Sequence, residues 1–391
     1  MTACVNWVLF DGRTLASSRL QGHAIHDFLV QQGHPSRLLS TPPFPLRDAP
    51  WRGRAAATVA ELAAGQVVVL QKLGGRRTEE LLRALRDRGA AVVYAAADLE
   101  PENELPLRCD AVVCSSRLLA EHWRAAGANA IEIPEPADFW LNPDGSGASP
   151  GRVRLCWIGH RKNWGTLEPI RRLLREPAFA GYELVTVSNH YEADVQWSLD
   201  AARAALAAAE VGIVPTRDDE LARYASTNRV VQVMAAGRPV VAGRIPPYEE
   251  LIVDGENGFL CATDDEWRAA LEALADSARR LELARSGWDS VRPRFHVEAV
   301  GARWLDVFER LGGMSPPPRS RLAEARLRAQ VLAAARAAYA REAEARDLGL
   351  GAVTRNAAVA AAALPLAPAA AAEAVTALGR AVVRAARRRI R

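Results

Sequence analysis

The stretch that decides the fold is YASTNRVVQVMAAGRPVVAGRIPPYEELIVDGENGFL, residues 224–260. Two hydroxyl residues precede apolar residues at helical spacing, which predicts a helix over 227–236. A Gly-Arg-Pro turn ends this helix, and the strand PVVAG follows over 239–243. The tight turn DGENG (254–258) leads into another strand, FLCA over 259–262. Alternating helices and strands of this kind are typical of a parallel sheet covered on both faces.

The same alternation continues outward from this stretch and divides the chain into two series. A polar run, LNPDGSGASPG over 141–151, separates them and is interpreted as a linker. The first series has predicted strands over 5–11, 67–71, 91–96, 111–116 and 131–134, with helices over 17–33, 54–64, 78–88 and 117–126. The second adds strands over 153–159, 183–188 and 211–215, and helices near 165–175, 199–209, 247–252, 264–286 and 297–311.

These patterns predict two tandem Rossmann-like, doubly wound α/β domains, which is also what a chain of 391 residues has room for. The first domain is expected over 1–141, the linker over 142–151 and the second domain over 152–311. In such architectures the last helix often crosses back to the first domain. Residues 312–391 follow as a helical, basic tail.

Positive charge is concentrated in this tail. Residues 315–391 hold 14 Arg against 5 acidic residues, which gives +9 and leaves −5 for the rest of a chain whose net charge is +4. The segment 357–372 is mostly alanine but short and broken by two prolines, so a membrane span is not expected. Three alternatives stay open: an Arg-rich helix on an anionic bilayer surface, a helix docked on the protein, and a partly disordered segment. Nucleic acid is not an expected partner, because Tyr339 is the only aromatic residue of the tail.

The cysteines and the first residues indicate an intracellular protein. The five cysteines form no CxxC pair and have no accompanying histidine spacing that suggests zinc. The opening MTACVNWVLFDG lacks the basic and apolar regions of an export signal. We therefore expect a cytoplasmic protein, with membrane association through the basic tail as the open question.

Ligands of open α/β sheets bind where the strands end, so the loops after the strands hold the first candidates. The loop DGRTLASSR (11–19) offers Gly12 for close approach of backbone to a ligand, and Arg19 at a helix start, where free N–H groups attract anions. A helix cap with a surface arginine is an equal alternative. The loop GHRKN (159–163) places Lys162 beside an arginine, and Lys162 is notable because the chain has only two lysines.

Two cations and an amide suit a diphosphate in the loop 159–163, with an ordinary solvated turn as the alternative. The start of the helix predicted over 227–236 is the other anion site. The candidate ligand-binding residues of these two places are Arg161, Lys162, Asn163, Ser226, Thr227, Asn228, Arg229 and Gln232.

The run NRVVQVMAAGRPVVA, followed by PPYEELIVDGENGFL, resembles the donor-binding segment of family 4 glycosyltransferases, which are retaining enzymes of the GT-B fold. Upstream pieces agree in order: ASSRLQGHAIHDFLVQQGH, VVVLQK, VVYAAADLEPEN and WIGHRKN. The resemblance covers about residues 5–310 and leaves the tail outside. It implies a nucleotide-sugar donor held between the two domains, with its diphosphate at a helix N-terminus.

Two positions depart from the family pattern. The family has two glutamates eight positions apart, of which the second hydrogen-bonds the nucleotide ribose; here these positions are Tyr224 and Gln232. A glutamine amide accepts hydrogen bonds more weakly than a carboxylate, and a tyrosine cannot replace a sugar-facing glutamate. Glu250 matches a further acid of the family, with a helix-cap carboxylate as the alternative.

Two residues are the catalytic candidates. Asp98 follows the strand predicted over 91–96, where related enzymes hold polar groups that face the acceptor; a loop-capping role is the alternative. Lys162 is the candidate for stabilising the leaving diphosphate. Lys72 ends the preceding strand and is placed to face the same cleft as Asp98. No metal and no other cofactor is expected, since the resemblance implies metal-independent transfer.

The sequence therefore predicts transfer of a sugar from a nucleotide-diphosphate sugar to a glycan, lipid-linked or small-molecule acceptor, with retention of configuration. Two alternatives are kept. One is a degenerate GT-B protein that binds a nucleotide or a partner without catalysis, because both family glutamates are replaced. The other, less favoured, is a nucleotide-sugar epimerase, which would need acid and base groups in the cleft.

Overall fold

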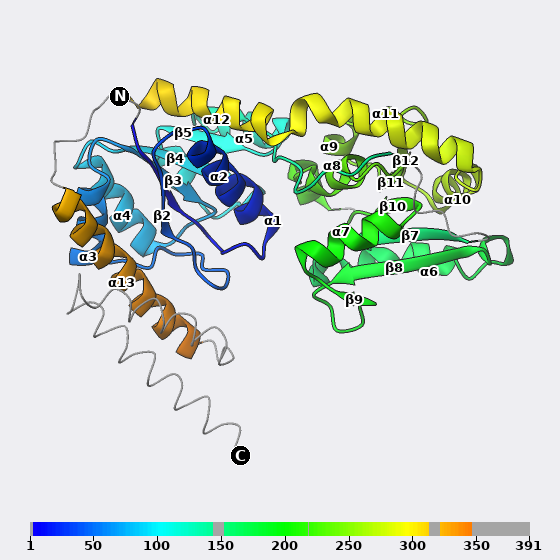
Figure 1. The fold of residues 1–391 in the computed structure, drawn as a ribbon, viewed down its shortest axis with the longest axis horizontal. Coiled ribbons are helices and arrows are strands. Elements are labelled where there is room, and N and C mark those ends of the chain that lie inside the picture. Colours follow the sequence, from blue (N-terminus) through cyan, green and yellow to red (C-terminus); the bar gives the residue numbers. More distant parts are fainter. Residues whose placement is uncertain (1–2, 144–151, 218, 313–320, 346–391) are drawn as a thin grey trace, which may run out of the picture.

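The computed structural model describes residues 3–143, 152–217, 219–312 and 321–345. These residues form two α/β domains that lie side by side (Figure 1), each built on a six-stranded parallel sheet. The prediction of two tandem doubly wound domains is therefore confirmed.

The first domain contains the N-terminal sheet. Its strands, in spatial order, are β2 (Ser36–Ser40), β1 (Val5–Val8), β3 (Val67–Gln71), β4 (Ala91–Ala96), β5 (Ala111–Cys114) and β6 (Ala130–Glu132). Its helices are α1 (Ala16–Ser18), α2 (Ala24–Gln31), α3 (Arg54–Leu62), α4 (Arg76–Arg86) and α5 (Arg117–Ala125), with a π-helical turn over Arg19–His23 between α1 and α2.

The second domain contains the C-terminal sheet. Its strands, in spatial order, are β12 (Phe259–Cys261), β11 (Val240–Gly243), β10 (Val211–Val214), β7 (Val153–Ile158), β8 (Tyr182–Ser188) and β9 (Val195–Gln196). The helices that follow in the chain are α6 (Glu168–Leu173), α7 (Leu199–Ala208), α8 (Asn228–Ala235), α9 (Pro246–Glu249), α10 (Asp264–Ala273), α11 (Ser277–Phe295), α12 (Val297–Leu311) and α13 (Arg321–Ala345).

Apolar side chains cover both faces of each sheet, which is why the central strands read as unbroken apolar runs such as VVVLQ. On the first sheet, one cluster joins the strands to α3, α4, α5 and α13, and another joins them to α2 and α12. On the second sheet, α7, α8, α9 and α11 pack on one face, and α6 and α10 on the other. Parallel strands buried in this way leave their carboxyl ends as the accessible edge.

Three features of the fold were not predicted. Strand β2 was missed because SRLLS carries few apolar residues, and it is a strand through its parallel pairing with β1. Strand β9 is only two residues long and is defined by its pairing with β8. The single helix predicted over 264–286 is wrong: α10 ends at Ala273, and the Asp276 carboxylate caps a new helix by accepting from the Ala278 N–H at 3.0 Å.

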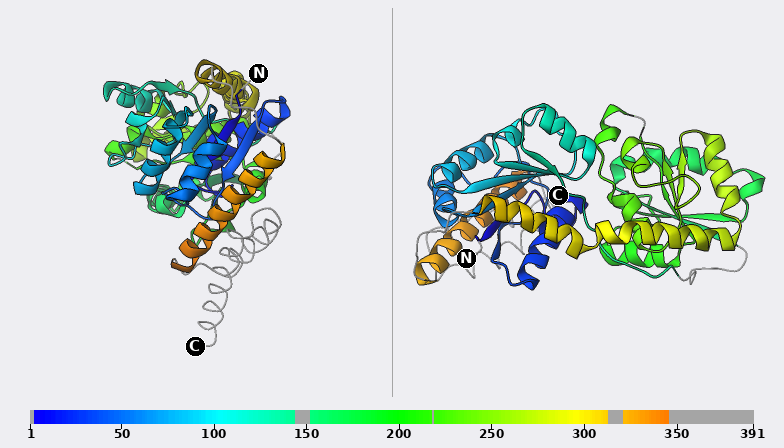
Figure 2. Two further views of the ribbon diagram at one scale, coloured as in Figure 1. Left: turned by 90° about the vertical axis from the view of Figure 1, so that its left-hand side faces the viewer. Right: turned by 90° about the horizontal axis from the view of Figure 1, so that it is seen from above.

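The last helix of the second domain belongs to the core of the first. Figure 2 shows α11 over the second domain and α12 continuing over the first. The Trp304 ring lies 5.8 Å from that of Trp7 on β1, measured between ring centroids. A Cβ on Gly301 would lie 2.3 Å from the Phe28 ring, so the glycine permits α12 to pack directly on α2. The two domains are thus tied by a helix as well as by the chain between their sheets.

Helix α13 is docked on the first domain (Figure 1). The Trp51 indole N–H donates to the Val331 carbonyl at 3.1 Å, and the Tyr339 hydroxyl, which is fully buried, hydrogen-bonds Ser40. The start of the tail is therefore a packed part of the protein. Residues 346–391, which include the Arg-rich end considered for membrane contact, lie outside the described residues. Within the described residues no helix is both long and apolar enough to cross a membrane.

Candidate active site

The chain passes from the first domain to the second through residues 133–143, and this crossing segment is fixed to α8. The Leu141 N–H donates to the Ala235 carbonyl at 2.9 Å. The side-chain amide of Gln232 accepts from the Asp138 N–H at 2.7 Å and donates to the Phe139 carbonyl at 3.1 Å. Gln232, predicted to contact a ribose, therefore uses both ends of its amide on the protein backbone in this structure.

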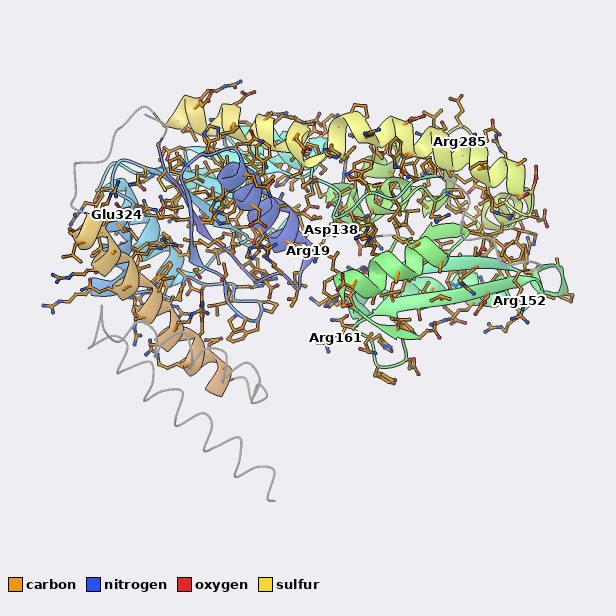
Figure 3. All side chains as sticks on the ribbon, in the orientation of Figure 1. Arg19, Asp138, Arg152, Arg161, Arg285 and Glu324 are labelled. Atoms are coloured by element: carbon orange, nitrogen blue, oxygen red, sulfur yellow. The ribbon has the colours of Figure 1, made fainter. Side chains whose placement is uncertain are left out.

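Arg19 lies between the domains in an ion pair with Asp138 of the crossing segment (Figure 3). Its Nε and Nη2 are 2.5 and 2.7 Å from the two carboxylate oxygens, a bidentate arrangement in which both side chains are only about a tenth exposed, 9% and 10%. The guanidinium also lies 5.2 Å from the ring centroid of Trp197, which belongs to the second domain. The positive charge of Arg19 is thus already matched by a carboxylate.

Glu135 is a deeply buried carboxyl group of the crossing segment, with 2% of the residue exposed. Its Oε2 accepts hydrogen bonds from the Ser226 hydroxyl and from the Asn228 side-chain amide, the latter at 3.1 Å. Its Oε1 is buried and accepts no hydrogen bond within the described part of the chain. Burial raises the pKa of Glu135 to about 7; donation by Ser226 opposes this rise, and the nearby Asp98 adds to it.

Lys72 and Asp98 follow the neighbouring strands β3 and β4 and form an ion pair with 2.6 Å between Nζ and Oδ2. Burial opposes the charge of Lys72, but the Asp98 carboxylate outweighs it and raises the pKa of the lysine. Lys72 is the one described residue other than glycine with a positive φ, 51°. Such strain at a strand end is a common feature of functional sites. Asp98 is the open member of the pair, with its side chain 54% exposed.

The loop 159–163 follows β7 and carries two exposed cations. The Arg161 N–H donates to the Asn189 side-chain oxygen at 2.8 Å, and the Lys162 N–H to Nδ1 of His160 at 3.2 Å, so the backbone of the loop is held in place. Neither cationic side chain has a hydrogen bond or ion pair to the described residues. Arg161 lies at the edge of the second domain nearest the first (Figure 3).

A stack of rings stabilises this loop from the side. The Arg171 guanidinium lies 4.3 Å from the Trp164 ring centroid, and the Trp164 ring lies 4.2 Å from that of His190 with an angle of 6° between the planes. His190 in turn stacks on Tyr191, which is 84% exposed. The loops after β7 and β8 are therefore rigidly joined, which favours a fixed position for Arg161 and its neighbours.

The start of α8 faces the first domain. The Ser226 hydroxyl accepts from the Asn228 N–H at 3.1 Å, while Thr227 makes no side-chain capping bond. The Arg229 guanidinium makes long contacts, 3.4 Å to the Pro215 carbonyl and 3.3 Å to the Tyr248 hydroxyl. Ser226 and Asn228 are thus committed to Glu135 and to each other, whereas Arg229 is held only weakly.

The other predicted residues take part in contacts between or within the domains. Glu250 forms an ion pair with Arg117 at the start of α5, with 2.8 Å between charged atoms. The Tyr224 ring lies 5.3 Å from that of His122, also on α5. Gly12 is close to Pro42, because a Cβ there would lie 3.2 Å from the Pro42 carbonyl.

Sequence reasoning did not single out Glu135, Asp138 or Trp197. A signal was present for the two acids, since EPADFW (135–140) directly follows the strand predicted over 131–134. This position after a strand is the same signal that marks the other candidate loops. Spacing along the chain cannot pair Glu135 with Ser226, because 91 positions separate them.

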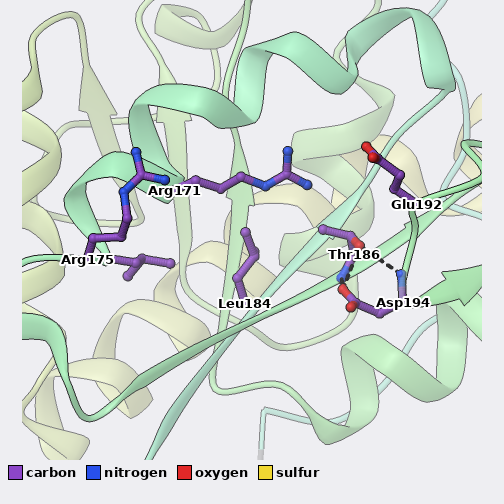
Figure 4. A pocket seen from close by; sticks show the side chains of 7 residues that line it. Arg171, Arg175, Leu184, Thr186, Glu192 and Asp194 are labelled. Carbon is purple, nitrogen blue, oxygen red and sulfur yellow. Dashed lines mark hydrogen bonds between the residues drawn. The ribbon is translucent and has the colours of Figure 1, made fainter.

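A pocket of about 260 Å³ lies on the second domain alone (Figure 4) and shares Arg171 with the ring stack. Arg171 of α6 and Arg175, two positions after this helix ends, line one side, and Glu192 and Asp194 line the other. The Asp194 carboxylate is already bonded to Thr186, at 2.6 Å from its hydroxyl. Among the described residues no group of three or more His, Cys, Asp or Glu side chains is arranged to hold a metal ion.

Comparison with known proteins agrees with the fold, and one family model matches part of the chain. Residues 151–279, most of the second domain, match the model of the family "Glycosyl transferases group 1". The second domain is therefore similar to the group 1 glycosyltransferases. No curated protein sequence matches the chain.

Solved structures with the GT-B fold of glycosyltransferases match both domains of the chain. Anabaena Alr3699/HepE, solved in complex with UDP and glucose, has a TM-score of 0.56 at 15% identity, covering 78% of this chain and 100% of its own. A sucrose-phosphate synthase from Thermosynechococcus elongatus has a TM-score of 0.55 at 12% identity, over 79% and 99%. The catalytic domain of starch synthase IV from Arabidopsis thaliana, bound to ADP and acarbose, has 0.56 at 11%, over 80% and 100%. At these identities the glycosyltransferase resemblance is one of fold.

Proposed function

We propose that the protein transfers a sugar from a nucleotide-diphosphate sugar to an acceptor held by the first domain, with retention of configuration. The observation that carries the proposal is the pair of exposed cations Arg161 and Lys162, which have no partner among the described residues. They follow β7 in a group 1 glycosyltransferase domain, at the edge nearest the first domain. A diphosphate matches them in charge.

In this proposal the diphosphate is the leaving group, and its developing charge is stabilised where it forms. Arg161 and Lys162 neutralise phosphate oxygens, while the weakly held Arg229 and the N-terminus of α8 supply further positive potential. Because these cations can carry the charge, no metal ion is required. Asn163 completes the loop as a hydrogen-bonding group.

The first domain supplies the acceptor side in the same scheme. Asp98 presents an exposed carboxylate that can accept a hydrogen bond from an acceptor hydroxyl, and Lys72 fixes its direction at 2.6 Å. Asp98 is therefore the proposed catalytic group of this domain. Closure of the domains around the substrates excludes water, so that transfer is favoured over hydrolysis.

One observation favours a second candidate, a nucleotide-binding protein without catalysis. The two family glutamate positions are Tyr224 and Gln232, and both side chains are engaged: Tyr224 packs on His122, and Gln232 holds the crossing segment. Glu250, the third matching acid, is paired with Arg117. Three side chains expected at the donor are thus used by the protein itself.

The test is to incubate the purified chain with UDP-, GDP-, ADP-, dTDP- and CDP-sugars and follow the donor by ¹H and ³¹P NMR. Release of nucleoside diphosphate, with a product of the donor's anomeric configuration, is the expected result. Binding without any release would favour the non-catalytic candidate. An isomerised donor would instead indicate an epimerase.

Contact with membranes through the tail is a separate proposal about location. Because α13 is packed on the first domain, a truncation should begin after Ala345 and leave this helix in place. The full chain is expected to sediment with vesicles that contain anionic lipid, and the chain that ends at residue 345 is expected to stay in solution.

A further inference from the structure

A carboxyl group lies beside the donor segment although the segment lacks the two acids expected of it. Glu135 lies near the start of the crossing segment, three positions after the end of β6, and contacts Ser226 and Asn228 at the start of α8. Tyr224 and Gln232, the positions where the resemblance calls for glutamates, lie on either side of this contact in the sequence. A carboxyl group is thus present beside the donor segment but comes from the crossing segment.

The two oxygens of this carboxyl group are in different states. Oε2 accepts two hydrogen bonds from the second domain, which fixes the plane and direction of the group. Oε1 accepts none from the described residues although it is buried. A buried acceptor without a donor costs free energy, and such groups in native proteins commonly mark a place where a ligand or an ordered water binds.

We infer that Glu135 is a donor-binding residue whose Oε1 accepts a hydrogen bond from a hydroxyl group of the donor sugar. The inference rests on the proposed function. Ser226 and Asn228 hold Oε2, so the carboxyl group is aligned for the sugar where the crossing segment packs on α8. Glu135 thereby links recognition of the sugar to the contact between the crossing segment and α8.

The charged groups around Glu135 define how this contact depends on pH. Asp98 and Lys72 of the first domain are its charged neighbours; from the second domain Ser226 and Asn228 face it, and neither titrates. The pKa of Glu135 is raised to about 7 by burial and by Asp98, against the donation from Ser226. The ionised carboxylate is the stronger acceptor, so affinity for the sugar should rise as the pH increases through this range.

The experiment compares two affinities in the full chain, one for a nucleoside diphosphate and one for its glucose conjugate. UDP, ADP and GDP are titrated calorimetrically against UDP-, ADP- and GDP-glucose at pH 6 and pH 8. The variants are Glu135→Gln and, as a matched control, Glu132→Gln, which removes a carboxylate three positions earlier on β6. We expect Glu135→Gln to lower the affinity for the sugar conjugate about tenfold and the affinity for the free diphosphate less than twofold.

The pH series provides the second readout. In the wild type the preference for the sugar conjugate should be larger at pH 8 than at pH 6, and in Glu135→Gln it should not change. If Glu135 merely held the domains together, its substitution would lower the affinities for diphosphate and conjugate equally. That result would overturn the inference. If the protein binds a nucleoside diphosphate but Glu135→Gln does not change its preference for the sugar conjugate over the diphosphate, the inference fails while the proposed function stands. If no nucleotide binds the wild type, both fall.

Discussion

The two surfaces that meet between the domains differ in how their charges are matched. On the first domain, Arg19 is bound by Asp138 through two short contacts, and Lys72 is bound by Asp98. On the second domain, the Arg161 and Lys162 side chains are exposed without a partner in the described residues. Of these four cations, the two on the second domain are the ones without a partner in the described residues.

This difference shows that the number of cations near a cleft does not locate an anion site. A buried ion pair has already satisfied both charges, and an anionic ligand could use its cation only by displacing the carboxylate. An exposed cation on a rigid loop is available at little cost. We therefore assign the diphosphate to the second domain and treat the cations of the first as parts of its structure.

The largest effect is expected from Arg19→Ala. Removing the guanidinium leaves the Asp138 carboxylate buried without its partner, so the free energy of unfolding should fall by about 3–5 kcal/mol. Arg13→Ala is the matched control, because Arg13 forms an exposed ion pair with Asp27. Its substitution should lower the free energy of unfolding by less than about 1 kcal/mol. Urea unfolding measures both. A small loss of stability together with a large loss of nucleotide affinity would instead make Arg19 a ligand of the diphosphate.

The next effect concerns Glu135 and the pH dependence of stability. Its pKa is raised from 4.5 to about 7 in the folded protein, so the unfolded chain ionises first as the pH rises. Below about pH 4.5 this group should not affect the free energy of unfolding. Between about pH 4.5 and about pH 7 the free energy of unfolding should fall by about 3 kcal/mol in total, and above that range it should level off. The free energy of unfolding of Glu135→Gln should lack this fall, and parallel pH curves for the two proteins would contradict it.

Lys162→Ala tests the second surface through turnover. Loss of one charge that stabilises the leaving diphosphate should lower kcat about 10²-fold, which corresponds to about 2.7 kcal/mol. Arg152→Ala is the control, since Arg152 is an exposed cation of the same domain, away from the boundary (Figure 3). Undiminished turnover by Lys162→Ala would remove Lys162 from the proposed mechanism.

The smallest effect separates strain from charge at Lys72. Its φ of 51° lies in the left-handed region, which glycine adopts freely and alanine does not. Both Lys72→Gly and Lys72→Ala remove the contact with Asp98, yet the glycine variant should be about 1 kcal/mol more stable than the alanine variant. Equal thermal stability of the two would mean that the backbone relaxes out of this conformation.

The fold follows from the sequence where burial alone defines an element. The runs VVVLQ and AVVYAA are strands with both faces covered, and their unbroken apolar residues predict this. SRLLS and the two residues of β9 carry no such pattern, since they become strands through pairing with a neighbouring strand, β1 and β8 respectively. The break before α11 depends on one capping side chain, Asp276, which periodicity does not register.

The sequence predicts which site residues follow the ends of strands, but not which residues they contact. Lys72 and Asp98 were placed at neighbouring strand ends, and the structure joins them in an ion pair. The partners of Arg19 and Gln232 lie in the crossing segment, and which residue meets which depends on how the two domains face each other. That orientation comes from α12 and the interdomain packing, which no local pattern encodes.

The most direct test of the central claim, that uncompensated charge on the second domain binds the nucleotide diphosphate, is a calorimetric titration of UDP, ADP and GDP into two double variants. Arg161→Ala with Lys162→Ala removes the two cations of the loop after β7, and Arg152→Ala with Arg285→Ala removes two exposed arginines elsewhere (Figure 3). The account predicts at least a hundredfold loss of affinity in the first and less than about threefold in the second. Equal affinities in the two double variants would contradict it.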